Sequence, residues 1–390
     1  MQTPMMTSGD MAELMKSLPH MSLPQPNVVS EMVLSCAQDT GRLRLGRRGE
    51  VVVFAVDGVG APVLQEACAS ADQFIVYRST FPSTSLVSWL AAVGLPPGQH
   101  PVTGPVLRTR PGLTTNYILD NQANWVVTEP DHSDLAAATP APTMFEVLAG
   151  LGLAAEVLIG DFFGISEAWI KLLTRGALRV DPSADLNPLR MSPLKMQEAA
   201  VADLLPRLGG GGQTFCRWVY VNFDDHIHHH GYSDELLLAL HRIAETAETL
   251  AAAGYTVLIH SDHGNMPNAC HPDQLAAWAS VDNPQYCTSP AGGAGRVRWL
   301  YPHPRLVDEV YDQISGALSD RIAVFMRDSA EWKEFTRYCA HPTLTQKAVG
   351  DVVTVSYGDA FPVPDTSYEW EHGSLHADEM IAGVAAWAGS

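Results

Sequence analysis

Four short clusters of carboxylate and imidazole side chains give this sequence the composition of a metal site. They are an Asp-Gly pair, an Asp-x-x-x-His-x-x-Gly pattern, a Ser-Asp-His-Gly pattern and a His-Gly pair. Together they supply three carboxylates and three imidazoles, namely Asp57, Asp224, His228, Asp262, His263 and His372. Hydrolysis with two metal ions needs ligands of these types around cations roughly 4 Å apart. The set is large enough to give each ion three protein ligands and to leave room for a substrate.

The spacing inside two of the clusters indicates how they could hold an ion. Asp224 and His228 would lie on the turn that leaves a strand, and Gly231 would let the backbone turn away. Asp262 and His263 are adjacent and follow a strand end, so they point differently. They can bind one ion in common or contact two.

Other histidines compete with the expected ligands. The His-rich run 226–230 could be a solvated loop or an adventitious metal binder. Within it, His228 has the matching spacing to both a carboxylate and a glycine. His260 lies inside an apolar run and is interpreted as a core residue, and His376 is an alternative to His372. We prefer His372 because the glycine that follows it fits a sharp turn.

A hydroxyl nucleophile is expected at the start of a helix. There, unpaired N–H groups and the helix dipole favour the negative charge of an attacked phosphate. The segment Thr80-Phe-Pro-Ser-Thr-Ser85, followed by the apolar residues 86–93, has this form. It offers Thr80, Thr84 and Ser85, and coordination to a metal would activate a hydroxyl at any of them.

Three apolar runs rich in Val and Ile end at the clusters and must position them. The runs are Val51–Val56, 218–223 and 255–261. They alternate with helical patterns such as 143–148 and 235–253, which predicts an α/β fold with a doubly wound, mostly parallel sheet and helices on both faces. Ligands bind such a sheet outside the carboxyl ends of its strands, so the clusters should converge there.

The chain of 390 residues is long enough for one large α/β domain with an insertion. We expect an N-terminal arm over 1–50, a catalytic core over 51–291 and 358–390, and an inserted α+β cap over 292–357. The cap is placed there because the pattern becomes mixed in that stretch and the last ligand cluster follows it.

Composition excludes several classes of function. The chain is 46% hydrophobic and 17% charged, as in globular proteins. Its formal charge of −19 argues against a surface that coats nucleic acid or binds an anionic membrane. The six cysteines include no C-x-x-C pair, so we expect buried free thiols. We find no signal peptide and no apolar stretch that could span a bilayer, which predicts a cytoplasmic protein.

The order of these motifs resembles that of the alkaline phosphatase superfamily, and most closely its type I phosphodiesterase/nucleotide pyrophosphatase-like proteins. The resemblance covers about residues 51–387 and includes the Phe-Pro-Ser-Thr segment and a final Glu379-Met. It implies two divalent ions, zinc first and manganese as the alternative. One ion would be held by Asp224, His228 and His372 and the other by Asp57, Asp262 and His263.

The resemblance also implies hydrolysis of a phosphodiester or pyrophosphate bond in a small anionic substrate such as a nucleotide, through a phosphothreonine intermediate. Counting back from Gly94 selects Thr84, whereas the Thr-Phe-Pro triplet selects Thr80. We favour Thr84 because it falls at the helix start. Asn116 resembles, by position, a donor to a substrate oxygen. The alternatives are a phosphomonoesterase of the same superfamily and a non-catalytic, metal-stabilised binding protein.

Overall fold

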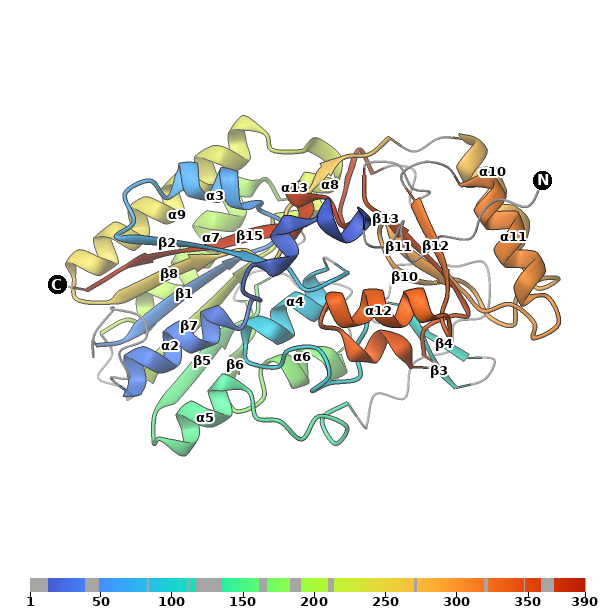
Figure 1. Cartoon of the computed structure of the whole chain (residues 1–390). Coiled ribbons are helices and arrows are strands. Elements are labelled where there is room, and N and C mark those ends of the chain that lie inside the picture. The colour runs from blue at the N-terminus through green and yellow to red at the C-terminus, as the bar shows by residue number, and fades with distance from the viewer. Residues whose placement is uncertain are drawn as a thin grey trace.

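The structure is a computed structural model of the chain. It describes residues 13–38, 49–82, 84–104, 106–110, 113–116, 135–160, 167–182, 191–209, 214–269, 272–318, 322–346, 348–358 and 368–389. At 85, 106–110, 113–116 and 294 the backbone alone is described. Two sheets lie side by side, and the short helices α8 (Asp224–His230) and α13 (Ala377–Met380) lie between them (Figure 1).

The larger sheet has seven strands in the order β2-β15-β8-β1-β7-β5-β6. Their bounds are β1 (Val51–Val56), β2 (Gln73–Arg78), β5 (Ala154–Leu158), β6 (Leu178–Val180), β7 (Thr214–Val221), β8 (Thr256–His260) and β15 (Ile381–Trp387). The strands from β8 to β6 are parallel, and β15 is antiparallel to both of its neighbours. The prediction of a mostly parallel α/β sheet is therefore confirmed.

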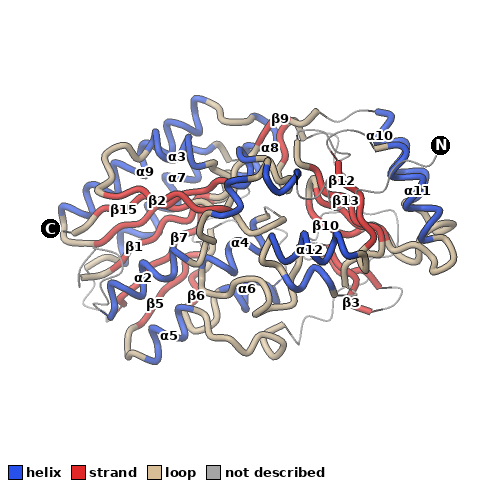
Figure 2. The backbone as a smooth tube through the Cα atoms, viewed as in Figure 1, coloured by secondary structure: helices blue, strands red, loops and turns tan. Residues whose placement is uncertain are grey.

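Helices cover both faces of this sheet, which explains why its central strands are continuous apolar runs. All six residues of β1 are buried, and they alternate between two cores: Val51 and Val53 face one, and Val52 and Phe54 the other. The first core includes α2 (Val28–Gln38), α4 (Ser85–Ala92), α5 (Met144–Gly150) and α6 (Glu167–Leu173). The second includes α3 (Ala61–Ala67), α7 (Pro193–Leu204) and α9 (Asp234–Ala252), and Figure 2 shows the two sets of helices on opposite sides of the strands.

Local capping fixes where two of these helices begin. Thr143 and Glu146 form a capping box at the start of α5, and the side chain of Ser233 accepts the N–H of Leu236 at the start of α9. Both helices lie within two residues of the predicted segments 143–148 and 235–253. In the described part of the chain, no helix is both long enough and apolar enough to cross a lipid bilayer.

The second sheet has six strands in the order β12-β13-β11-β10-β3-β4. Their bounds are β3 (Val106–Arg110), β4 (Leu113–Asn116), β10 (Gly292–Ala294), β11 (Val297–Leu300), β12 (Ile322–Met326) and β13 (Val352–Ser356). Strands β10 to β13 fall inside the stretch 292–357 that was expected to form a cap. Strands β3 and β4 precede it by more than 170 residues in the numbering, so this sheet draws on two distant parts of the chain.

Three helices pack on the second sheet. Helix α10 (Pro272–Val281) and helix α11 (Val307–Ala317) form a separate core with β11, β12 and β13. Helix α12 (Ala330–Tyr338) lies on the other face and joins the first core through Trp332 and Phe335. Because α10 begins before residue 292, helices as well as strands reach this unit from outside the expected cap. The division at residues 292 and 357 stays a prediction.

The N-terminal segment packs on the main body. Leu14, Leu18 and Met21 are buried in the same core as α2. Met21 belongs to the 3-10 helix Pro19–Ser22, which precedes α2 in the sequence. The hydroxyl of Tyr338 in α12 donates to the carbonyl oxygens of Met15 and Leu18 at 3.0 and 2.9 Å. The described part of the segment is thus fixed to α12 by hydrogen bonds. The remaining short elements are β9 (Met266–Pro267), β14 (Trp370–Glu371) and the 3-10 helices Leu205–Arg207 and Pro342–Thr345.

The five described cysteines are free and buried, as the sequence predicted. Burial raises the pKa of Cys36 to about 11 and that of Cys68, Cys216 and Cys287 to about 12. Thiols with such a high pKa are poor nucleophiles and poor metal ligands. Cys270 lies outside the described residues.

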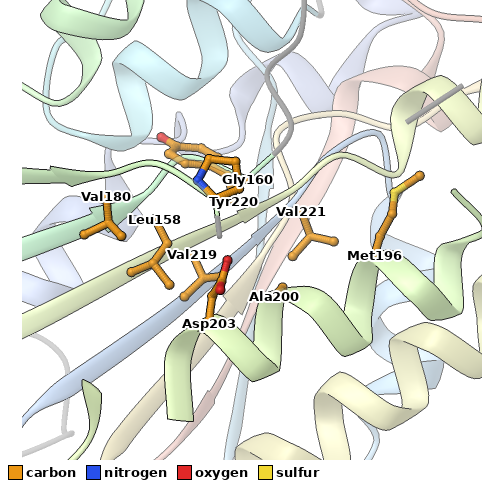
Figure 3. A pocket seen from close by; sticks show the side chains of 10 residues that line it. Leu158, Gly160, Val180, Met196, Ala200, Asp203, Val219, Tyr220 and Val221 are labelled. Atoms are coloured by element: carbon orange, nitrogen blue, oxygen red, sulfur yellow. The ribbon is translucent and has the colours of Figure 1, made fainter. Parts of the chain in front are cut away.

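A small cavity lies between α7 and the ends of β5 and β7 (Figure 3). Its volume is about 20 Å³, and Leu158, Met196 and Val219 make much of its lining apolar. A space of this size holds about one water molecule, so this cavity is too small for a substrate.

Candidate metal and active site

The six side chains expected to bind metal form two groups where the central strands end. The first group consists of Asp224, His228 and His372, and the second of Asp57, Asp262 and His263. Within each group the candidate ligand atoms lie within 4.8 Å of one another, and all six residues are buried. The rings of His263 and His372 stack with centroids 3.9 Å apart, so the two groups adjoin.

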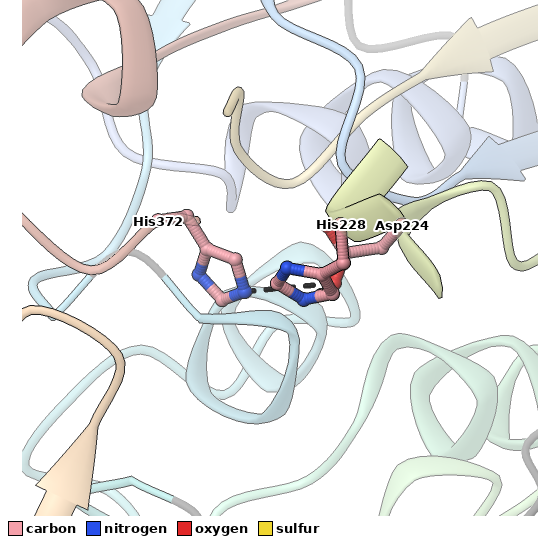
Figure 4. A group of neighbouring side chains, drawn as sticks. All are labelled: Asp224, His228 and His372. Atoms are coloured by element: carbon pink, nitrogen blue, oxygen red, sulfur yellow. Dashed lines mark ion pairs between the residues drawn. The ribbon is translucent and has the colours of Figure 1, made fainter. Parts of the chain in front are cut away.

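The first group combines helix α8 with the loop before α13. The sequence predicted that Asp224 and His228 lie on a turn after the strand, but both lie on this helix. Residues four apart are about one helical turn apart, so both side chains lie on one face. Oδ2 of Asp224 lies 3.1 Å from Nε2 of His228 and 3.5 Å from Nε2 of His372. Figure 4 shows the two histidines approaching this carboxylate from different segments.

Gly231 ends α8 and allows the chain to leave it. Its φ is 62°, and a Cβ there would lie 2.4 Å from the indole of Trp370. Only glycine combines this conformation with so close an approach. Trp370 is in turn the residue whose carbonyl holds His228, so the helix end and the ligand are fixed together.

The second group comes from two neighbouring parallel strands. Asp57 follows β1, and Asp262 and His263 follow β8, which is paired with β1 in register up to Ala55 and His260. Nε2 of His263 lies 3.3 Å from Oδ2 of Asp262 and 3.7 Å from Oδ1 of Asp57. Oδ2 of Asp262 is buried and accepts no hydrogen bond from any described residue. A buried carboxylate oxygen of this kind is a suitable ligand for a cation.

Two of the imidazoles are oriented so that Nε2 can bind a cation. Nδ1 of His228 lies 2.8 Å from the carbonyl oxygen of Trp370, and Nδ1 of His263 lies 3.0 Å from that of Gly264. A carbonyl only accepts, so Nδ1 carries the proton in each ring. In a neutral ring the lone pair of Nε2 then faces the carboxylate oxygens. The lone pair and the carboxylates repel each other unless a cation lies between the nitrogen and the oxygens. This donor set and its orientation fit zinc or manganese.

Electrostatics in the first group favour a bound positive charge. Burial alone would raise the pKa of Asp224, but the charges of His228 and His372 outweigh burial and hold this pKa well below its ordinary value. Burial would lower the pKa of His228, but the carboxylates of Asp224 and Glu371 raise it to about 10. The group therefore takes up a proton when no metal is present, and a metal ion would displace it.

In the second group, burial is the largest influence on the pKa of His263. It lowers the pKa of His263, although the nearby charge of Asp262 acts in the opposite direction. This imidazole is thus neutral around pH 7, which is the form that binds metal.

A buried ion pair supports the segment that carries His372. Arg296 and Glu379 are both fully buried and paired. Arg296 also donates to the carbonyl oxygens of Glu371, Met266 and Pro267 at 3.1, 3.2 and 3.0 Å. The backbone N–H of Arg296 donates to the carbonyl of His372 at 3.1 Å. This pair connects α13 to β9, β14 and the turn between β10 and β11.

The competing histidines lie outside both groups. His376 caps α13, and its side chain is 38% exposed. His226 contacts Ser233 Oγ at 2.8 Å, and His229 packs against Tyr368. His260 is buried in β8 between aromatic rings, as expected of a core residue. His228 and His372 therefore belong to the first ligand group, and the competing histidines do not.

Both candidate threonines lie beside helix α4, and their hydroxyls have no hydrogen-bond partner within the described ranges. Thr84 is its N-cap residue, 3% exposed, and its Oγ1 has no described hydrogen-bond partner, although an N-cap side chain usually accepts an N–H of the first turn. Thr80 is 1% exposed, and its Oγ1 likewise has no hydrogen-bond partner among the described residues. Trp89 of α4 donates to Oδ2 of Asp57 at 3.5 Å, which brings the helix to the second group. The side chain of Ser85 lies outside what is described.

Asn116 ends strand β4 at the edge of the second sheet. Its side chain lies outside the described residues, so its role as a donor to substrate stays a prediction.

Sequence reasoning missed the residues that hold the ligands in place. Arg296, Tyr232 and Asn265 belong to no motif of ligand-type residues. One signal was present for Asn265, because it directly follows the Asp-His-Gly cluster. Arg296 gave none, since a single arginine in a mixed segment is usually exposed.

A mostly parallel seven-stranded sheet, a second sheet beside it and two ligand groups at the strand ends define an alkaline phosphatase-like fold. Human ectonucleotide pyrophosphatase/phosphodiesterase 5 shares it with a TM-score of 0.60 at 13% identity, over 86% of this chain and 87% of that chain. The murine protein has a TM-score of 0.58 at 13% identity with the same coverage.

Phosphonoacetate hydrolase from Sinorhizobium meliloti 1021, solved with phosphonoacetate, has a TM-score of 0.59 at 15% identity, over 87% of this chain and 90% of that chain. No protein-family model and no curated protein matches the sequence. At these identities the likeness establishes the fold.

Proposed function

We propose that this chain is a two-metal phosphoesterase that cleaves a phosphodiester or pyrophosphate bond through a phosphothreonine intermediate. The observation that carries this proposal is the pair of buried ligand groups, which adjoin through the stacked rings of His263 and His372. Trp89 of α4 donates to Asp57 of one of these groups. The solved neighbours add support for a small phosphate-containing substrate. One is an inactive threonine-to-alanine form of the murine protein in complex with AMP, and another holds phosphonoacetate.

Each of the two ligand groups would hold one ion. Asp224, His228 and His372 would hold one, and Asp57, Asp262 and His263 the other. Two divalent ions supply Lewis acidity toward a phosphate oxygen and lower the pKa of a nearby hydroxyl. Zinc fits the mixture of carboxylates and imidazoles, and manganese accepts the same set.

The chain itself supplies the nucleophile and the closed environment. Oγ1 of Thr84 loses its proton and forms a bond to phosphorus, while the bond between phosphorus and the leaving oxygen breaks and that oxygen takes up a proton. Water then hydrolyses the phosphothreonine, which returns the hydroxyl to Thr84 and releases phosphate or a phosphate monoester. The unpaired N–H groups at the start of α4 favour the negative phosphate, and burial of Thr84 limits access of water before the substrate binds.

Two matched substitutions test the nucleophile, because Thr80 and Thr84 are both buried and neither hydroxyl has a hydrogen-bond partner in the part of the chain that is described. We expect Thr84→Ala to reduce turnover of bis-p-nitrophenyl phosphate by on the order of 10³-fold or more, since loss of a covalent nucleophile removes a reaction path. Thr80→Ala should retain turnover within about tenfold. Metal analysis of each variant by mass spectrometry should still find both ions.

The outcomes separate the alternatives. Loss of turnover in Thr80→Ala alone would move the nucleophile to Thr80. Preferential turnover of p-nitrophenyl phosphate by the unmodified protein would favour a phosphomonoesterase. A protein that binds no zinc or manganese and turns over neither substrate would refute the enzyme proposal, and metal binding without any turnover would leave a metal-stabilised binding protein.

A further inference from the structure

Asn265 and Tyr232 form a hydrogen-bonded bracket that joins three loops at the candidate metal site. Nδ2 of Asn265 donates to Oδ1 of Asp224 at 2.8 Å and to the carbonyl of Gly58 at 3.2 Å. The hydroxyl of Tyr232 accepts the N–H groups of Gly60 and Asn265 at 3.1 and 3.0 Å, and it donates to the carbonyl of Gly58 at 3.1 Å. Asp57 directly precedes the loop that contains Gly58 and Gly60, and His263 lies two residues before Asn265.

The bracket is buried and tightly packed. Asn265 is 2% exposed. Gly58 has φ of 77°, and a Cβ there would lie 2.5 Å from Oδ1 of Asp224 and 2.9 Å from Nδ2 of Asn265. The backbone at Gly58 therefore packs closely against both the amide of Asn265 and the carboxylate of Asp224. Little room remains for Asp224 to rotate.

The amide determines which oxygen of Asp224 faces the rest of its group. Oδ1 is engaged by Asn265, and Oδ2 is left toward Nε2 of His228 at 3.1 Å and Nε2 of His372 at 3.5 Å. A carboxylate that accepts a hydrogen bond on one oxygen offers the other as a single ligand atom. The orientation of Asp224 thus depends on a side chain from the loop of the second ligand group.

We propose that Asn265 is a positioning residue for Asp224, fixed in turn by Tyr232, and that it selectively raises the metal affinity of the group formed by Asp224, His228 and His372. This inference rests on the proposed two-metal function. Loss of a residue that orients a metal ligand typically lowers metal affinity by about 10–100-fold. The group formed by Asp57, Asp262 and His263 keeps all its own ligands when the amide is removed.

Zinc binding by calorimetry, with Asn265→Ala and Asn265→Asp compared with the unmodified protein, tests the inference. We expect one equivalent of zinc to bind about 10–100-fold more weakly in Asn265→Ala and the other to stay within about twofold. Asn265→Asp keeps the size of the side chain but sets a carboxylate against Oδ1 of Asp224. It should therefore weaken the first equivalent more than alanine does. Turnover of bis-p-nitrophenyl phosphate at limiting zinc should fall in the same order and recover in excess zinc.

A matched control is Asn283→Ala, since Asn283 donates to the carbonyl of Ser280 in an exposed turn and contacts neither ligand group. It should bind zinc as the unmodified protein does. Circular dichroism at the assay temperature verifies that each variant is folded. Unchanged binding in a folded Asn265→Ala, equal weakening of both equivalents, or an Asn265→Asp variant equal to the unmodified protein would overturn the positioning role. Failure of the unmodified protein to bind zinc or manganese would instead overturn the proposed function and this inference with it.

Discussion

Replacing Glu379 with glutamine should destabilise this protein strongly, because it removes a fully buried negative charge. The carboxylate of Glu379 is 0% exposed and is paired with Arg296, which is also 0% exposed. Glu379→Gln keeps the shape of the side chain but removes the negative charge that Glu379 places against the guanidinium of Arg296. Loss of one partner of a buried ion pair costs about 3–5 kcal/mol of unfolding free energy.

The other contacts of Arg296 place the expected value at the lower end of that range. Its guanidinium keeps three carbonyl acceptors, on Glu371, Met266 and Pro267. These dipoles solvate part of the charge, so we expect a loss of about 3 kcal/mol, or a factor of roughly 150 in the folding equilibrium. The double variant Arg296→Met with Glu379→Leu should lose less than Glu379→Gln, because it replaces both charges of the buried pair by apolar side chains.

Urea unfolding followed by tryptophan fluorescence measures these differences. Glu334→Gln is the control, since Glu334 is exposed on α12, and it should change stability by no more than about 0.5 kcal/mol. The reasoning is refuted if Glu379→Gln lies within about 1 kcal/mol of the unmodified protein, or if the double variant loses more than Glu379→Gln.

Two further predictions concern the pH dependence of stability and a helix cap. Burial, aided by the charge of His100, holds the pKa of His341 at about 3. In the unfolded chain a histidine has a pKa of about 6.5, so as the pH falls the unfolded state takes up a proton before the folded state does. Stability therefore falls as the pH drops below about 6.5. His341→Gln should reduce the stability difference between about pH 7.5 and 5 by roughly 2 kcal/mol in urea unfolding; an unchanged difference would contradict a neutral His341. Thr143→Ala removes the capping box of α5 and should cost about 1–2 kcal/mol, whereas the exposed Thr249→Ala should cost less than about 0.5. Equal thermal melting of these two variants would argue against the cap.

The sequence predicted the central layer of the fold because its signals are local. Val51–Val56 is a continuous apolar run, and the structure has strand β1 with these bounds. Asp57 and Asp262 follow neighbouring parallel strands, so the rule that strand ends converge was enough to bring them together. The grouping of the six candidate ligands also agrees with the two sets implied by the resemblance, while metal binding by them stays a prediction.

Non-local pairing explains what the sequence did not predict. The pairing of β3 with β10 joins Val106 to Gly293, and no local period encodes contact over such a separation. Helix α8 was missed because it is seven residues long and, apart from Ile227, consists of aspartate and histidine, so it has no apolar period. Asn265 and Arg296 act through backbone carbonyls and a carboxylate brought close by tertiary structure. Their residue types alone give no indication of this.

The position of β15 has a consequence for biosynthesis. Residues 381–387 form an inner strand between β2 and β8, whose sequences precede it by about 300 and 120 residues. A ribosome must therefore release almost the whole described chain before the sheet can close. Until then β2 has no partner and β8 presents one unpaired, apolar edge, which is the kind of surface that aggregates or recruits a chaperone. Yield of native protein during slow or interrupted translation should depend on how well that edge is shielded.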